Sequence, residues 1–212
     1  MKLILASSSP RRADIVRNAG IQVEVRAIPI DESLRTGESH SGYVQRLALA
    51  KARAAADAER EPRQEIYVVG ADTIILAGGE ILCKPTSADD ARRMLRRLSG
   101  TWHEVHTGLA LLRRPGANSA ARASGSSERV IEEITRVQLA PLSEAELDVY
   151  IATGEWSDKA GAYGIQGIGG RYVTRIEGCY YNVMGLPIAR LWSLLHEFGW
   201  NNGAAASQVA DA

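Results

Sequence analysis

The chain has 212 residues, of which 45% are hydrophobic and 24% charged, so it can bury one sizeable core or the cores of two small lobes. Its 25 basic and 25 acidic residues give a formal net charge of zero. A chain without overall positive charge is not expected to bind nucleic acid or an anionic membrane surface, so any basic site must be local. We therefore expect neither nucleic acid nor a membrane among its partners.

The sequence also indicates a compartment. It has no apolar run of the roughly 18 residues that a membrane helix needs. The short apolar run at the N-terminus soon gives way to polar residues, unlike a signal peptide. Cys83 and Cys179 lack a CxxC partner and a nearby histidine pair, which disfavours structural zinc and fits a reducing environment. We expect a cytoplasmic protein.

The N-terminal stretch predicts an anion site. Residues 3–6 are apolar without alternation, as in a strand buried on both faces, and Ser9 and Pro10 then predict the N-cap and first residue of a helix. Free backbone N–H groups, hydroxyls and the guanidinium groups of Arg11 and Arg12 would surround one point, which suits phosphate. The alternative is an ordinary strand-to-helix turn with solvated arginines.

Two acidic residues follow the next expected strand, over residues 21–28. Neighbours on extended backbone point to opposite sides, so only one of Asp31 and Glu32 can face a site. A polar loop is expected over residues 33–41.

The segment 41–60 has helical periodicity, and Lys51 falls on the apolar stripe that includes Val44 and Leu47. Two interpretations remain open for this lysine. Its ammonium group either extends past the core into solvent or reaches an anion beside the core.

A second buried strand over residues 66–70 is followed by Asp72, at the position where α/β sheets place chemistry. A hairpin over residues 74–82 would return Lys84 toward Asp72. The alternative is that Asp72 is a plain turn residue.

The remaining periodicity predicts further elements: a helix capped by Thr86 or Ser87, strands over 101–112, 130–139 and 171–176, a helix opened by the capping box of Ser143 and Glu146, and a closing helix from Leu186 and Pro187. His103 and His106 would face opposite sides of their strand and so form no metal pair. We expect His106 to be hydrogen-bonded in the core or in a site wall, and His103 to be solvated.

Two polar segments and one glycine-rich segment complete the chain. We expect a mobile loop at about 113–128 and a disordered tail over 201–212, attached to a single domain over 1–200. The segment 156–170 is rich in glycine but carries aromatic residues and Gln166, which indicates a loop whose backbone closely approaches another group.

The candidate site residues share one chemistry, because cations and acids together suit a metal-bound polyphosphate. They are Ser9, Arg11, Arg12, Lys51, Lys84, Glu32, Asp72 and Gln166. The chain has neither the GxxxxGK[ST] of P-loop proteins nor a Rossmann GxGxxG after its first strand.

The motifs resemble those of the Maf family of nucleoside triphosphate pyrophosphatases. They are LASSSPRR (5–12), GADT (70–73), KP (84–85), LSG (98–100), VHTG (105–108), DKAGAYGIQG (158–167) and YNVMGLP (181–187). The resemblance implies an elongated α/β fold with a mixed sheet, two lobes and a central cleft, shared with inosine triphosphatase-like enzymes and usually homodimeric. It also implies metal-dependent hydrolysis of a nucleoside triphosphate at the α–β phosphoanhydride, with Mg²⁺ or Mn²⁺, giving the monophosphate and pyrophosphate.

ADT together with GIQG is similar to the branch of the family that acts on dTTP and UTP rather than on 7-methyl-GTP. By this resemblance, Asp72 is the proton acceptor or a metal-linked acid. The residues that set base choice are Arg11, Thr73 and Gln166, and those that line the phosphate and metal site are Ser9, Arg12, Glu32, Lys51 and Lys84. Cys83 departs from the family, which usually has glycine before Lys-Pro.

Two alternatives to an active enzyme stay open. One is a nucleotide-binding regulator of septum formation in cell division that acts through a protein partner. The other is a nucleotide-binding module without catalysis, which the departure at Cys83 keeps open and the complete set of charged residues disfavours.

Overall fold

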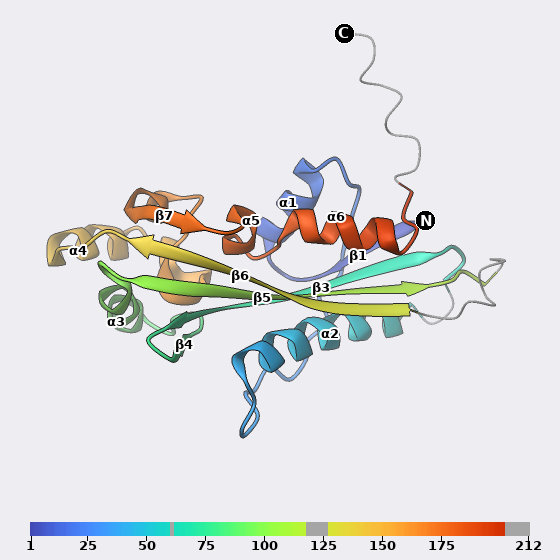
Figure 1. The fold of residues 1–212 in the computed structure, drawn as a ribbon, viewed down its shortest axis with the longest axis horizontal. Coiled ribbons are helices and arrows are strands. Elements are labelled where there is room, and N and C mark those ends of the chain that lie inside the picture. The colour runs from blue at the N-terminus through green and yellow to red at the C-terminus, as the bar shows by residue number, and fades with distance from the viewer. Residues whose placement is uncertain (60–61, 118–126, 202–212) are drawn as a thin grey trace, which may run out of the picture.

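The computed structural model describes residues 1–59, 62–117 and 127–201 (Figure 1). The strands are β1 (Lys2–Ala6), β2 (Glu24–Val25), β3 (Ile66–Ala77), β4 (Glu80–Leu82), β5 (Trp102–Arg114), β6 (Ser127–Leu139) and β7 (Val173–Glu177). The helices are α1 (Pro10–Asn18), α2 (His40–Ala58), α3 (Ala88–Leu98), α4 (Glu144–Ala152), α5 (Tyr180–Val183) and α6 (Ile188–Glu197), with short 3-10 turns η2 (Glu155–Asp158), η3 (Ala160–Ala162) and η4 (Ile168–Tyr172). None of the described helices is both long and apolar enough to span a bilayer.

One mixed sheet runs through the molecule. Its strand order is β2-β1-β3-β5-β6-β7, and β4 pairs with β3 off this path. The pairs β2–β1 and β1–β3 are parallel, and the others are antiparallel. Because β3, β5 and β6 have 12 or 13 residues each, the sheet is long and narrow (Figure 1). The expected elongated α/β fold with a mixed sheet is confirmed.

Helices cover both faces of the sheet at one end. In Figure 1, α1 and α6 lie on one face and α2 lies on the other. Leu3 and Leu5 of β1 pack in the cluster that contains α1 and α6, whereas Ile4 and Ala6 pack against α2. The absence of polar alternation in β1 is thereby explained, and the predicted burial on both faces is confirmed.

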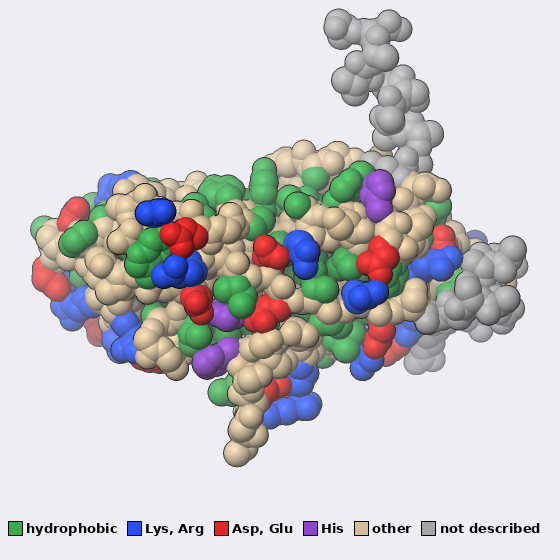
Figure 2. Space-filling view, in the orientation of Figure 1, with side chains coloured by type: hydrophobic (Ala, Val, Ile, Leu, Met, Phe, Trp, Pro, Cys, Tyr) green, Lys and Arg blue, Asp and Glu red, His purple; other side chains and the backbone are tan. Residues whose placement is uncertain are grey.

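A separate apolar cluster lies at the other end of the sheet. It includes Leu95 and Leu98 of α3, Leu147 and Tyr150 of α4, and Val137 of β6. Apolar packing is therefore divided between the two ends of one sheet, as expected for two lobes. Acidic and basic side chains are interspersed over the face shown in Figure 2, in keeping with the zero net charge.

The edge of β3 is open between these two ends. β1 pairs with residues 66–70 of β3, and β4 pairs with residues 75–77. Residues 71–74 therefore have no strand neighbour on this side, although β5 pairs with them on the other side. This interruption places Asp72 and Thr73 at the floor of a gap in the sheet.

Two glycines bring α2 against the sheet. A Cβ atom at Gly70 would overlap the carbonyl oxygen of Ala48, and one at Gly108 would overlap the carbonyl oxygen of Val44. The close contact is possible only because glycine lacks this atom. It brings Lys51 of α2 next to β3.

Several sequence predictions differ from the structure in detail. Of the strand expected over 21–28, only Glu24 and Val25 pair with β1. These two residues are exposed and form the outer edge of the sheet, where a strand has a single neighbour to extend its pairing. The strand expected to end at Gly70 continues to Ala77, since β5 pairs with residues 66–76 and β4 pairs with residues 75–77. The expected tail lies outside the described residues, apart from Asn201.

The expected loop at 113–128 is shorter than predicted within the described chain, because β5 extends to Arg114 and β6 begins at Ser127. Residues 118–126 lie outside the described part. The predicted solvation of His103 is wrong. It is 2% exposed, and its Nε2 lies 2.9 Å from the hydroxyl oxygen of Tyr163, which covers it.

Candidate active site

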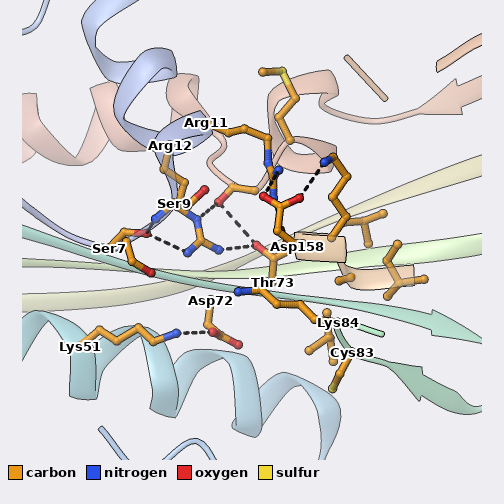
Figure 3. A pocket seen from close by; sticks show the side chains of 18 of the residues that line it. Ser7, Ser9, Arg11, Arg12, Lys51, Asp72, Thr73, Cys83, Lys84 and Asp158 are labelled. Atoms are coloured by element: carbon orange, nitrogen blue, oxygen red, sulfur yellow. Dashed lines mark hydrogen bonds and ion pairs between the residues drawn. The ribbon is translucent and has the colours of Figure 1, made fainter. Parts of the chain in front are cut away.

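A cleft of about 640 Å³ opens at the gap in the sheet (Figure 3). Its wall is formed by the turn between β1 and α1, the segment before α2, α2 itself, β3 and the glycine-rich segment after η2. All the predicted site residues line it: Ser9, Arg11, Arg12, Glu32, Lys51, Asp72, Thr73, Lys84 and Gln166. The structure thus brings together residues that the sequence alone could not show to converge.

The turn after β1 holds Arg12 in the cleft wall. Ser9 is the N-cap of α1 as predicted, and Pro10 begins the helix. The Arg12 guanidinium donates to the Gly185 carbonyl oxygen (2.7 Å), to Thr73 Oγ1 (2.9 Å) and to Ser7 Oγ (3.2 Å). Burial lowers the pKa of Arg12. Because its three hydrogen-bond partners are all neutral, the positive charge of Arg12 is available to attract an anion in the cleft.

Lys51 joins the two acidic residues of the site. Its Nζ lies 2.6 Å from Asp72 Oδ1 and 2.7 Å from Glu32 Oε1. Of the two interpretations open for this lysine, the structure supports the one in which its ammonium group reaches an anion, here two carboxylates. Asp72 is 8% exposed, so its charge needs this partner.

Glu32, rather than Asp31, faces the cleft. Asp31 is exposed, and its Oδ1 accepts a hydrogen bond from the Ser33 N–H (2.9 Å). The Tyr43 hydroxyl donates to the Glu32 carbonyl oxygen (2.8 Å), which fixes the backbone of Glu32 beside α2. Burial, with help from nearby acidic groups, raises the pKa of Tyr43 to about 12, so the hydroxyl remains a donor at neutral pH.

The opposite wall carries the remaining candidates. Arg11 Nη1 lies 2.8 Å from Asp158 Oδ2, so a salt bridge joins α1 to η2 across the mouth of the cleft (Figure 3). Gln166 is exposed, as is Lys84, which forms no ion pair within the described part of the chain. Thr73 Oγ1 lies 2.9 Å from Thr107 Oγ1 besides accepting from Arg12.

Sequence reasoning missed two contributors. Asp158 was noted only as the first residue of the motif DKAGAYGIQG, and its contact with Arg11 spans 147 positions. The carbonyl of Gly185, which accepts from Arg12, belongs to the motif YNVMGLP, but a backbone acceptor gives no side-chain signal. Both depend on long-range contacts that local patterns do not encode.

The donor atoms fit a divalent ion that is also bound by substrate. Within residues 1–59, 62–117 and 127–201, no group of three or more His, Cys, Asp or Glu side chains is placed to hold a metal by itself. Glu32 and Asp72 do meet at one point, where Lys51 now lies between them. Mg²⁺ is commonly held by one or two carboxylates plus phosphate oxygens, and this pair meets that requirement.

Residues 2–198 match the family described as Maf-like protein. The chain belongs to the Maf family. Curated relatives include a dTTP/UTP pyrophosphatase of Hahella chejuensis, which is 46% identical over 93% of this chain and 92% of its own length. Another, from Anaeromyxobacter sp. (strain Fw109-5), is 48% identical over 93% of this chain and 90% of its own length. These members match this chain over nearly their full length.

Solved structures similar to this Maf chain are more distant in sequence. The Ham1 protein of Staphylococcus aureus is 13% identical over 93% of this chain and 100% of that chain, with a TM-score of 0.45. A HAM1 protein from Coxiella burnetii is 14% identical over 93% of this chain and 99% of that chain, with a TM-score of 0.46.

Proposed function

We propose that this chain hydrolyses dTTP and UTP to the monophosphate and pyrophosphate by attack at the α–β phosphoanhydride. The observation that carries the proposal is a cleft in which the buried Asp72 meets Lys51 and Glu32, with Arg12 close by. Relatives that are 46% and 48% identical are named dTTP/UTP pyrophosphatase. Their names support the same substrate class here.

The basic residues suit a triphosphate. Arg12 carries a charge that no described carboxylate neutralises by direct contact, and Lys84 extends from the loop after β4 without an ion-pair partner among the described residues. With the Ser9 hydroxyl at the start of α1, they would bind phosphate oxygens and offset the charge that develops on the pyrophosphate leaving group.

Glu32 and Asp72 would hold the divalent ion, either Mg²⁺ or Mn²⁺, together with oxygens of the substrate. When bound, the ion would supply positive charge to the phosphates and lower the pKa of a neighbouring water. Asp72 is the proposed proton acceptor. Lys51 contacts its Oδ1 and leaves Oδ2 without a hydrogen bond from the described residues, so this oxygen is free to take a proton.

Base choice is assigned to Arg11, Thr73 and Gln166. The amide of Gln166 presents both a donor and an acceptor, which matches the edge of uracil or thymine. Thr73 binds Arg12 and Thr107 in the free protein, so its influence on the base would be exerted through Arg12. A homodimer and a cytoplasmic location belong to the same proposal. The family resemblance supports the homodimer, and the free cysteines Cys83 and Cys179 suit a reducing compartment.

The test is release of pyrophosphate from dTTP, UTP, CTP, GTP and 7-methyl-GTP, with and without Mg²⁺ or Mn²⁺. Asp72→Asn is compared with the wild type. We expect metal-dependent turnover of dTTP and UTP that falls by at least about a thousandfold in the variant. Binding of nucleotide without turnover by the wild type would contradict the proposal and favour the nucleotide-binding regulator instead.

A further inference from the structure

Residues 164–169 of the glycine-rich segment line the cleft in part and also surround the Glu155 carboxylate. Glu155 Oε2 accepts a hydrogen bond from the Ile168 N–H (2.7 Å), and Glu155 Oε1 accepts one from the Gly169 N–H (2.9 Å). The Tyr150 hydroxyl donates to Glu155 Oε1 (2.8 Å) and accepts from the Gly164 N–H (3.2 Å). The segment is thus tied to Glu155 directly at one end and through Tyr150 at the other.

The glycines of this segment make room for the carboxylate. A Cβ atom at Gly167 would overlap Glu155 Oε2, and one at Gly164 would lie 2.6 Å from Lys159 Cε and 3.1 Å from Glu155 Oε1. A Cβ at Gly169 would lie 2.9 Å from the Tyr150 hydroxyl oxygen. None of the three has a positive φ, so steric room rather than backbone conformation requires glycine here. The close approach expected from the sequence is an approach to Glu155.

Glu155 itself does not line the cleft, whereas Ile165 and Gln166 do. The carboxylate lies behind the segment, and the side chain of Gln166 is exposed at the cleft side. Lys159 Nζ donates to the Glu155 carbonyl oxygen (2.5 Å) and so fixes the Glu155 backbone. Glu155 therefore does not contact a nucleotide bound in the cleft and would act on it indirectly, through the segment that it holds.

We propose that Glu155 is a positioning residue that holds the backbone of residues 164–169 so that Gln166 faces the base of the nucleotide. The inference rests on the proposed function, because it concerns base choice in the same cleft. Hydrogen bonds from backbone amides to a carboxylate are stronger than those between neutral groups, so this anchor restricts the segment more than backbone bonds alone.

The protonation state of Glu155 agrees with this role. Burial raises its pKa, but the hydrogen bonds from Gly169, Ile168 and Tyr150 outweigh burial and bring the pKa below its ordinary value. The side chain is therefore ionised at neutral pH and accepts hydrogen bonds through both oxygens.

The test compares Glu155→Gln with Glu146→Gln. Glutamine at 155 keeps one acceptor oxygen but places an NH₂ group against a backbone N–H. Glu146 is a matched control in the same lobe, because its Oε2 accepts from the Ser143 N–H (2.8 Å) in the capping box of α4, away from the cleft. For each variant, amide hydrogen exchange in residues 160–170 and kcat and KM for UTP and CTP are measured.

We expect Glu155→Gln to speed exchange at Ile168 and Gly169 and to lower the preference for UTP over CTP by about tenfold, mainly through KM for UTP. Glu146→Gln should change neither the exchange at Ile168 and Gly169 nor the preference for UTP over CTP. Glu155→Asp keeps the charge and should retain more of the preference than Glu155→Gln does. Circular dichroism and the unfolding midpoint establish that each variant is folded.

Unchanged exchange at Ile168 and Gly169 would overturn the proposal, as would faster exchange with an unchanged preference for UTP. An equal fall in kcat for both nucleotides would also overturn it, because that result indicates a general structural role. If the wild type turns over no nucleotide, the proposed function fails, but the UTP-to-CTP ratio of binding constants from calorimetry still decides the role of Glu155.

Discussion

The ammonium group of Lys51 lies between two carboxylates, 2.6 Å from Asp72 Oδ1 and 2.7 Å from Glu32 Oε1. Two acids that converge in a partly buried cleft repel each other unless a cation lies between them. Lys51 supplies that cation from α2, whose close packing on Gly70 sets its position. The same lysine therefore holds the two acids together in the free protein.

This arrangement predicts strong coupling between Lys51 and Asp72. Lys51→Met leaves the Asp72 carboxylate buried without its cation, whereas in the double variant Lys51→Met/Asp72→Asn that charge is gone. We expect the double variant to lose about 1–3 kcal/mol less free energy of unfolding than the two single variants lose together. Urea unfolding of the wild type, both single variants and the double variant measures the free energies of this cycle.

A parallel cycle between Lys2 and Glu59, which lie 2.9 Å apart at a more exposed site, is the control. Its coupling should be below about 1 kcal/mol, because water screens exposed pairs. Additive effects of Lys51→Met and Asp72→Asn would show that the contact contributes nothing measurable.

Gly70→Ala should displace α2 from the sheet. The added Cβ would overlap the Ala48 carbonyl oxygen and lie 2.8 Å from the Ala52 backbone nitrogen, and neither backbone group can move independently of the helix. We expect a loss of about 3 kcal/mol in the free energy of unfolding, together with reduced turnover because Lys51 moves with α2. Denaturant unfolding and pyrophosphate release measure the two effects.

Gly42→Ala is the control on the same helix. Its Cβ would lie 3.1 Å from Ser39 Oγ, the N-cap acceptor of the Gly42 N–H, so only a small shift of this one side chain is required, and alanine favours helix. The free energy of unfolding of Gly42→Ala should stay within about 1 kcal/mol of the wild-type value. Equal stability of Gly70→Ala and Gly42→Ala would contradict the close packing seen at β3.

Features encoded by neighbouring residues could be predicted from the sequence. The apolar run ending in Ser9 and Pro10 predicted β1, the N-cap and α1, and helical periodicity singled out Lys51 as a charge on an apolar face. The capping box of Ser143 and Glu146 was likewise confirmed, because it depends on residues three apart.

Features set by strand pairing and long-range packing could not be predicted from the sequence. The open edge of β3 beside Asp72 exists because β1 ends at Ala6, opposite Gly70, and β4 ends at Leu82, opposite Ile75, which requires the register of three strands. The burial of His103 depends on Tyr163, and no local pattern near either residue pairs them. The glycine-rich segment was recognised as a close approach, but its partner Glu155 was not.

Cys83→Gly should leave turnover within about threefold of the wild type. Among described non-glycine residues only Ala162 has a positive φ, so the backbone at Cys83 does not require glycine. The departure from the family then affects a side chain at the cleft rather than the path of the chain. Steady-state pyrophosphate release with dTTP measures the effect, and a rise of more than about tenfold would indicate that the thiol obstructs the substrate.

Alkylation of Cys83 should block the cleft, because the residue lines it beside Lys84. Burial, with the nearby charges of Asp72 and Glu32, raises the pKa of the thiol, so little thiolate is present at neutral pH. We expect slow alkylation by iodoacetamide that accelerates in alkaline solution and is slowed by bound dTTP. Mass spectrometry of a Cys179→Ser variant follows the reaction, and full activity after complete modification would contradict the prediction.

His103 should make the stability of the protein depend on pH. Burial lowers its pKa from 6.5 to about 4, so the folded state resists protonation. The unfolded chain takes up the proton first as the pH falls, and stability present above pH 6.5 is lost between 6.5 and about 4. Over this range we expect a decrease of about 3 kcal/mol in the free energy of unfolding from this residue.

The variant His103→Leu/Tyr163→Phe removes the titrating ring and also the hydroxyl that would otherwise lose its partner at 2.9 Å. Its free energy of unfolding should fall less steeply between pH 6.5 and about 4 than that of the wild type, since the protonation of position 103 no longer differs between the two states. Tyr163→Phe alone keeps His103 and should keep the steep decrease. Equal slopes for the wild type and the double variant, measured by urea unfolding at each pH, would show that His103 is already protonated or exposed in the folded protein.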